Sequence, residues 1–203
     1  MLQVRSARYK SYPLSVVDRR DELVAAATAW VLEHGLGGLS LRPLAKAIGT
    51  SDRMLLYYFE SRDGLVAAIS DFAGQQLVAA MPAVDPAHPP RSAKVWLDGA
   101  WALFSDDAIR PAMQLLFELD ALAARSAGPA RDAAAAVTAR WLAVVDEALA
   151  ALGVPTRRRR ELTPVIAAAL VGLALEHLVA DSGSGPVALR ALARIIDDAR
   201  ASA

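Results

Sequence analysis

The sequence contains no cysteine, which excludes a disulfide framework and any metal site built on thiolates. Its three histidines, His34, His88 and His177, lie too far apart to form a ligand motif such as His-Glu-x-x-His. No Gly-rich phosphate loop occurs, and segment 182–185 lacks the pattern of a nucleophile turn. We therefore expect no enzyme activity, no metal and no cofactor.

Net charge and long apolar runs are also missing. The 203 residues carry 22 basic and 22 acidic side chains, so overall charge gives no attraction to nucleic acid. The longest apolar run, Val165 to Leu175, is shorter than the roughly 20 residues that span a bilayer. No apolar segment follows the basic residues at the front of the chain, as it would in a signal peptide. We expect a cytoplasmic protein that does not enter a membrane.

Helical periodicity is what the sequence does contain. Apolar residues recur at spacings of three and four throughout the chain, and no stretch alternates with the two-residue period of a strand. Four such patterns precede a proline-rich segment, Pro82 to Pro90, and five follow it. The sequence therefore predicts an all-α protein of about nine helices.

Residues 40–62 predict two short helices joined by a turn from Gly49 to Ser51, with a further helix starting at Ser61. Two short helices with a Gly-containing turn are typical of the helix-turn-helix unit, whose second helix enters a DNA major groove. We therefore expect a basic flexible arm over 1–14, a three-helix helix-turn-helix DNA-binding domain over 15–62, and a helical ligand-binding and dimerisation domain over 63–203.

The exposed start of that second helix is expected to meet base edges through Asp52, Arg53 and Leu56. Arg53 can donate two hydrogen bonds to guanine, Asp52 can accept one from cytosine, and Leu56 can contact a thymine methyl group. A second set is suited to phosphates: Ser40, Arg42, Ser51, Tyr57, Tyr58 and Arg62. The basic arm either reaches phosphates or a minor groove, or stays unbound.

Residues 16–66 resemble the DNA-binding domain of the TetR/AcrR family of one-component repressors. The resemblance is carried by Leu39-Ser40-Leu41-Arg42, Leu44-Ala45, Ile48-Gly49, Ser51, Leu55, Tyr57, Phe59, Ser61-Arg62 and Leu65. Met54 and Leu56 depart from the family pattern, in which threonine and tyrosine are common at these positions. The resemblance implies a homodimer that binds double-stranded operator DNA with an inverted repeat. A small molecule in the C-terminal domain is then expected to release the DNA.

The helical patterns after the proline-rich segment carry aromatic and soft apolar side chains, which are typical of ligand pockets between helices. The candidate pocket residues are Trp96, Trp101, Phe104, Met113, Phe117, Trp141 and His177, with Glu118 and Asp120 as further polar groups. Aromatic residues at helical spacing suit an ordinary core equally well. If they line a pocket, they favour a lipophilic inducer, whose identity the sequence leaves open.

The segment from Val165 to Leu175 is apolar on all sides, and the final helical pattern has a wide apolar stripe. Both features favour a homodimer packed through the two C-terminal helices as a four-helix bundle. The candidate interface residues are Ile166, Leu170, Leu173, Leu189, Leu192 and Ile196. A central core helix within one protomer is the alternative, and His177 faces either the pocket or the dimer seam.

Two questions remain open at the level of sequence. The run Arg157–Arg160 is interpreted as a solvated connector, with a second DNA contact as the less favoured alternative. The rival function is a helical ligand-binding or scaffolding protein with a degenerate reading head, since the net charge is zero and Met54 and Leu56 are apolar. Repression and activation, the operator and the target genes are not distinguished by the sequence.

Overall fold

The computed structural model describes residues 16–82, 90–125, 127–180 and 183–201. Within these ranges the chain forms nine α-helices and no strand, which confirms the all-α prediction. The helices are α1 (Val16–His34), α2 (Leu41–Ala47), α3 (Asp52–Phe59), α4 (Arg62–Ala80), α5 (Ala93–Phe104), α6 (Arg110–Arg125), α7 (Pro129–Ala151), α8 (Thr156–Val179) and α9 (Gly185–Ala201). The predicted basic arm, 1–14, lies outside the described residues.

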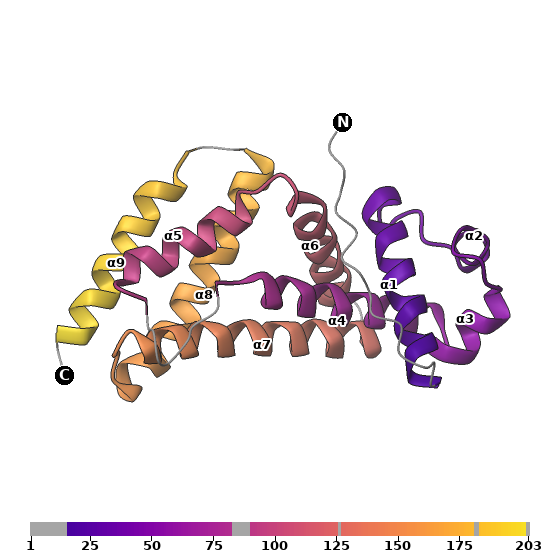
Figure 1. Cartoon of the computed structure of the whole chain (residues 1–203), viewed down its shortest axis with the longest axis horizontal. Coiled ribbons are helices and arrows are strands. Elements are labelled where there is room, and N and C mark those ends of the chain that lie inside the picture. The colour runs from indigo at the N-terminus through magenta and orange to yellow at the C-terminus, as the bar shows by residue number, and fades with distance from the viewer. Residues whose placement is uncertain (1–15, 83–89, 126, 181–182, 202–203) are drawn as a thin grey trace.

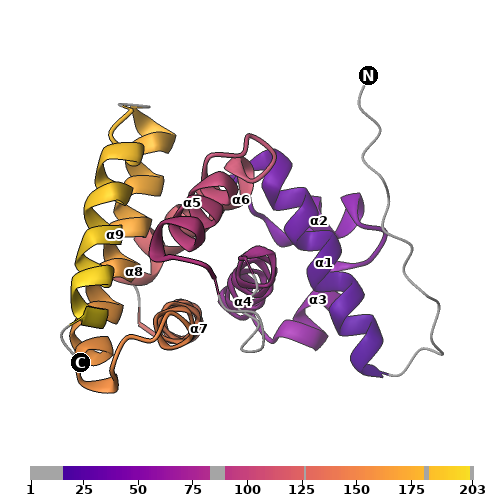
Figure 2. The same cartoon turned by 60° about the vertical axis from the view of Figure 1, so that its left-hand side comes forward.

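The molecule is elongated, with α1, α2 and α3 forming a head at one end (Figure 1). α4 leaves this head and runs beside α7 along the long axis, while α5, α8 and α9 form the opposite end. The turned view places α4 centrally, with α1 on one side and α7 and α8 on the other (Figure 2). The head is therefore connected to the rest of the protein mainly through α4 and α6.

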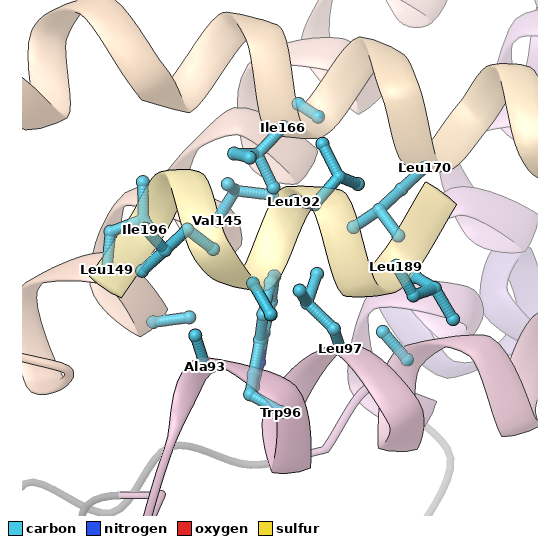
Figure 3. Close-up of a cluster of buried hydrophobic side chains, with 14 of the residues drawn as sticks. Ala93, Trp96, Leu97, Val145, Leu149, Ile166, Leu170, Leu189, Leu192 and Ile196 are labelled. Carbon is cyan, nitrogen blue, oxygen red and sulfur yellow. The ribbon is translucent and has the colours of Figure 1, made fainter. Parts of the chain in front are cut away.

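Two clusters of buried apolar side chains account for this arrangement. The head cluster contains Leu44, Leu55 and Phe59, and it also takes in Leu115 and Leu119 from α6. The second cluster lies between α5, α7, α8 and α9 (Figure 3). α4 contributes to both clusters along its length. A change in the tilt of α4 or α6 would therefore alter the packing of the head.

Local sequence signals fix the helix-turn-helix. The hydroxyl of Ser51 accepts a hydrogen bond from the N–H of Met54 at 3.2 Å and caps α3, and Ser61 caps α4 in the same way through Gly64 at 3.0 Å. Gly49 adopts a φ of 70°, a left-handed conformation that ends α2 at little steric cost. Both caps follow the sequence prediction.

Most of the predicted dimer-interface residues lie in the core of their own protomer. Figure 3 shows them between α5, α7 and α9, and their exposed fractions are at most 8% for Ile166, Leu170, Leu189, Leu192 and Ile196. Leu173 is partly buried against the same cluster. The apolar pattern identified buried positions correctly, but the cover comes from α5 and α7 of the same chain. The apolar side chains that α8 and α9 leave exposed are Val165, Leu175, Val179, Val187 and Ile195.

α8 is the one described helix that is long and apolar enough to cross a membrane by length and composition. This is weak evidence for a membrane span, because the core helix of a soluble protein meets the same criteria. Its apolar window is 39% buried within the protein, which leaves one flank covered and one flank open. The open flank is a candidate for contact with another protein surface.

Candidate nucleic-acid interface and ligand cavity

The structure gathers the three predicted base-contacting residues on the outer face of α3. Asp52, Arg53 and Leu56 are all exposed, while Leu55 and Phe59 of the same helix are buried in the head core. A side-chain oxygen of Asp52 accepts a hydrogen bond from the N–H of Arg53 at 3.0 Å, which supports the first turn. The face is therefore free to enter a groove, and the base contacts themselves remain a prediction.

The residues predicted to hold phosphates divide into two groups. Ser40, Arg42, Ser51 and Tyr57 are exposed, and the exposed fraction of Tyr57 is 72%. The hydroxyl of Ser40, unlike that of Ser51, caps no helix and keeps its hydrogen-bonding capacity for a ligand. These four side chains are available to DNA.

Tyr58 and Arg62 have structural contacts inside the head. Tyr58 is partly buried against the head core and meets the ring of Tyr57 edge-on, with centroids 5.1 Å apart. The Nε of Arg62 donates to the carbonyl of Leu39 at 3.1 Å and ties the loop before α2 to the start of α4. Any phosphate contact by Arg62 would use its remaining guanidinium donors.

A cavity of about 380 Å³ lies between α4, α5, α6, α7 and α8. Four predicted pocket residues line it: Phe104, Met113, Phe117 and Trp141. Trp141 also donates its indole N–H to the carbonyl of Ala167 at 3.3 Å, and its ring meets Phe104 edge-on at 5.8 Å. The walls are mainly apolar, as expected for a small-molecule site.

Three further predicted pocket residues do not line this cavity. Trp96 is only 2% exposed and fills the core beneath α9, and Trp101 packs edge-on against His177 at 5.4 Å. His177 is partly buried at this contact within its own protomer. Among the aromatic residues of α5, only Phe104, at the C-terminal end of the helix, lines the cavity.

The structure adds lining residues that the sequence did not reveal, on α4, α7 and α8. They are Ser70, Gly74, Leu77, Val78, Val137, Thr138, Leu142, Pro164, Ala167, Ala168 and Val171, with Met81 and, on α6, Leu116. Position 74 requires glycine, because a Cβ there would lie 2.5 Å from a methyl group of Val137. Nothing in the sequence pairs these two positions, so this close approach of α4 and α7 could not be predicted.

The polar groups on the cavity wall are few. Ser70 is buried, Thr138 donates its hydroxyl to the carbonyl of Ala134 at 3.0 Å, and Asp120 is the remaining polar residue. Withdrawal of the Asp120 carboxyl from bulk water raises its pKa above the ordinary value. Asp120 was among the polar groups predicted from the sequence, and it is the one that lines the cavity.

Glu118, also predicted as a polar pocket group, points the other way. Its carboxylate accepts a hydrogen bond from the backbone N–H of Leu36, in the loop after α1, at 3.0 Å. Two residues along a helix are rotated by about 200°, so Asp120 and Glu118 lie on opposite sides of α6. One face of α6 therefore borders the cavity and the other contacts the head.

Comparison with known proteins bears on the N-terminal head. Residues 23–69 match the sequence profile of the bacterial regulatory proteins of the tetR family. This segment carries a tetR-type DNA-binding domain. No curated protein sequence matches the chain significantly. In the described residues no group of three or more His, Asp or Glu side chains is placed to hold a metal ion.

Solved structures with a similar fold include proteins named as TetR-family members. A TetR-family member from Streptomyces coelicolor A3 is 29% identical, covers 88% of this chain and 98% of its own, and has a TM-score of 0.63. The multidrug binding protein EbrR, crystallised with imidazole, is 27% identical over 88% of this chain and 89% of its own, with a TM-score of 0.64. A putative TetR-family regulator from a Rhodococcus species is 24% identical, covers 90% of this chain and 99% of its own, and has a TM-score of 0.65. The matched family model describes bacterial regulatory proteins, in agreement with the regulatory role predicted from the sequence.

Proposed function

We propose that this chain is a homodimeric, cytoplasmic repressor of the TetR family that binds an inverted-repeat operator and is released from it by a small molecule. The observation that carries the proposal is the position of α6. One side of this helix borders the cavity through Met113 and Phe117, and the other side holds the head through Glu118 and Leu36. A ligand and the reading head thus act on the same short helix.

DNA binding is supported by the exposed face of α3. Arg53 and Asp52 offer complementary hydrogen-bonding groups to guanine and cytosine, and Leu56 offers an apolar contact. Ser40, Arg42, Ser51 and Tyr57 surround this face and are exposed. Contacts to DNA phosphates fix the position of the protein on the duplex, whereas contacts from α3 to base edges determine which DNA sequence is bound.

Release by a ligand follows from the way the cavity is enclosed. α4 is fixed to α7 by the close approach of Gly74 to Val137 and by an ion pair between Asp71 and Arg140, whose oxygen and nitrogen lie 2.5 Å apart. A molecule that fits between α4, α6 and α7 selects the arrangement of these helices that best surrounds it. Since α4 and α6 both pack into the head core, a shift there reorients the head and weakens operator binding.

Dimerisation is supported by the open flank of α8 and α9. Val165, Leu175 and Val179 on α8, with Val187 and Ile195 on α9, are between 41% and 76% exposed. Exposed apolar side chains of this size favour an interaction site, and a second copy of the same chain offers an identical face for two-fold packing. Two heads joined in this way would read two half-sites with a fixed separation.

The proposal for a small-molecule ligand is strengthened by the relative EbrR, which is described as a multidrug binding protein. An apolar cavity is present in this chain between α4, α5, α6, α7 and α8. The aromatic lining favours a lipophilic molecule.

The test is selection of bound sequences from a random double-stranded DNA library by the purified full-length protein near physiological salt. Enrichment of an inverted repeat is the expected result, and it would give the operator and the half-site spacing. Enrichment of a single half-site would contradict the dimer, and no enrichment would contradict the repressor. Release is tested afterwards by adding candidate ligands to the protein on the selected operator.

A second candidate function is a ligand-binding protein with a degenerate reading head. The observation that favours it is the exposure of two apolar side chains in the head, Met54 at 39% and Leu56 at 42%. This candidate predicts that ligands bind the cavity while the library selection yields nothing. The two functions are therefore separated by the same experiment.

A further inference from the structure

We propose that the cavity takes a lipophilic organic cation, a protonated amine or a quaternary ammonium, with the carboxylate of Asp120 as its counter-ion. The inference rests on the proposed function only in taking this cavity as the ligand site. It adds the charge of the ligand, which neither the family nor the fold determines.

The charge of the cavity wall favours a cation. Asp120 is the one ionisable residue among the described residues that line it. Arg140, which precedes the lining residue Trp141 in α7, is paired with Asp71 and does not line the cavity. Across the described part of the chain, Asp120 takes part in no hydrogen bond or ion pair. A bound molecule therefore meets one negative charge that the protein does not neutralise.

The cavity that Asp120 lines also has an aromatic surface. Phe104, Phe117 and Trp141 contribute rings to its lining, and the face of an aromatic ring attracts a cation. An organic cation can therefore pair its charge with Asp120 and pack its apolar part against the aromatic rings. An anion would be repelled by Asp120 and would find no basic group on the wall.

An Asp120 carboxylate without a partner becomes costly once a ligand fills the cavity. The side chain keeps access to solvent, and its partial desolvation raises its pKa and disfavours the ionised form. A neutral ligand that fills the cavity removes still more water from the carboxyl and increases this cost. A cation replaces the lost hydration with an ion pair, so the same filling of space becomes favourable.

The position of Asp120 also connects this charge to the head. Asp120 and Glu118 lie on opposite sides of one turn of α6, and Glu118 holds the N–H of Leu36. A cation drawn to Asp120 thus acts directly on the turn of α6 that contacts the head.

The experiment compares two molecules of nearly the same shape on the full-length protein without DNA. Benzyltrimethylammonium carries a permanent positive charge, and neopentylbenzene replaces its nitrogen by carbon and is neutral. Binding is measured by ligand-observed NMR titration at pH 7.5 for the wild type, Asp120→Asn and Glu147→Gln. Glu147 is an exposed carboxylate of α7 away from the cavity, so its variant controls for the change in net charge.

We expect the wild type and Glu147→Gln to bind the cation about tenfold more tightly than the neutral molecule, the size expected for a partly solvated ion pair. Asp120→Asn should remove this preference and leave the binding of the neutral molecule unchanged or tighter. Equal binding of both molecules by the wild type, or a preference that survives in Asp120→Asn, would overturn the proposal, as would the absence of any binding of the cation. Because no DNA is present, such a failure leaves the repressor hypothesis to its own test by operator selection.

Discussion

The carboxylate of Glu118 accepts a hydrogen bond from the backbone N–H of Leu36 at 3.0 Å, across 82 positions of sequence. Leu36 belongs to the loop that follows α1, and Glu118 belongs to the helix that borders the cavity. This is a directional contact between the helix-turn-helix head and α6, in addition to the apolar packing of Leu115 and Leu119. Through this hydrogen bond, a movement of α6 displaces the loop after α1 in the head.

Replacement of Glu118 by alanine should weaken this connection. The N–H of Leu36 loses its acceptor, and the free energy of unfolding is expected to fall by about 1 kcal/mol. A ligand that binds the cavity should then release DNA less effectively, because movement of α6 reaches the head less directly. Glu118→Gln keeps a side-chain carbonyl and serves as the control, which should restore the ligand effect in a fluorescence-anisotropy titration. Equal loss in both variants would argue against a role for the hydrogen bond.

Replacement of Arg53 by alanine should relax specificity. We expect a loss of about 1–3 kcal/mol per half-site for the preferred base pair and little loss on a site changed at that pair. Arg42→Ala is the matched comparison, since its expected contact is to a phosphate. It should weaken binding to all sequences and reduce the slope of log affinity against log salt by about 1. Identical profiles for the two variants would mean that Arg53 does not read a base.

Replacement of Gly64 by alanine should displace α3 from α4. A Cβ at this position would lie 2.1 Å from the carbonyl oxygen of Phe59, which is backbone and cannot move aside cheaply. The expected loss of stability is about 2 kcal/mol, measured by urea unfolding, with a larger loss of DNA affinity. Gly37→Ala controls for the change from glycine, because nothing lies within 4 Å of a Cβ there. A urea-unfolding curve of Gly64→Ala like that of the wild type would contradict the packing.

Replacement of Val179 by glutamate should dissociate the proposed dimer without unfolding the protomer. Val179 is 76% exposed, so the charge is tolerated by the isolated chain but is buried in a pair. The mass measured by light scattering should fall to that of a monomer while circular dichroism stays unchanged. Val95→Glu places the same change on α5, at a side chain that is 55% exposed, and should leave the mass of the dimer intact.

Replacement of Asp120 by asparagine should stabilise the protein at neutral pH. Burial raises the pKa of Asp120 in the folded state, so ionisation costs stability. Below the ordinary pKa of an aspartate, about 3.9, the group is protonated in both states and costs nothing. The cost appears as pH rises through the folded pKa and is complete above it. The difference between variant and wild type in urea unfolding should therefore be small near pH 3.5 and larger at pH 7.

The helices and caps of this protein could be predicted from the sequence because they depend on neighbours along the chain. The apolar period gave nine helices, Ser51 and Ser61 gave two helix starts, and Gly49 gave the end of α2. The exposed face of α3 followed from the same period, since Leu55 and Phe59 had to be buried and Asp52, Arg53 and Leu56 were left outside. The family resemblance was carried by this local pattern.

The contacts of the run Arg157–Arg160 could not be predicted from the local sequence pattern. The run was interpreted as a solvated connector, but Arg159 donates to Asp146 at 3.2 Å and to the carbonyl of Val154 at 3.3 Å, which holds the start of α8 against α7. The start of α8 lies at the end of the molecule away from the head (Figure 1), where a DNA contact is not favoured. These partners lie on other segments, so spacing could not reveal them.

By itself, the sequence determined which segments are helical, where the reading helix lies and which of its side chains face outward. Only the tertiary structure decided that Ile166, Leu170 and Ile196 are covered by their own protomer, and that Glu118 faces the head while Asp120 faces the cavity. The physical reason is that the periodicity of the sequence shows which face of a helix is apolar and which is polar. Which helix covers that face depends on contacts between residues far apart in the chain, and those are fixed only when the helices pack.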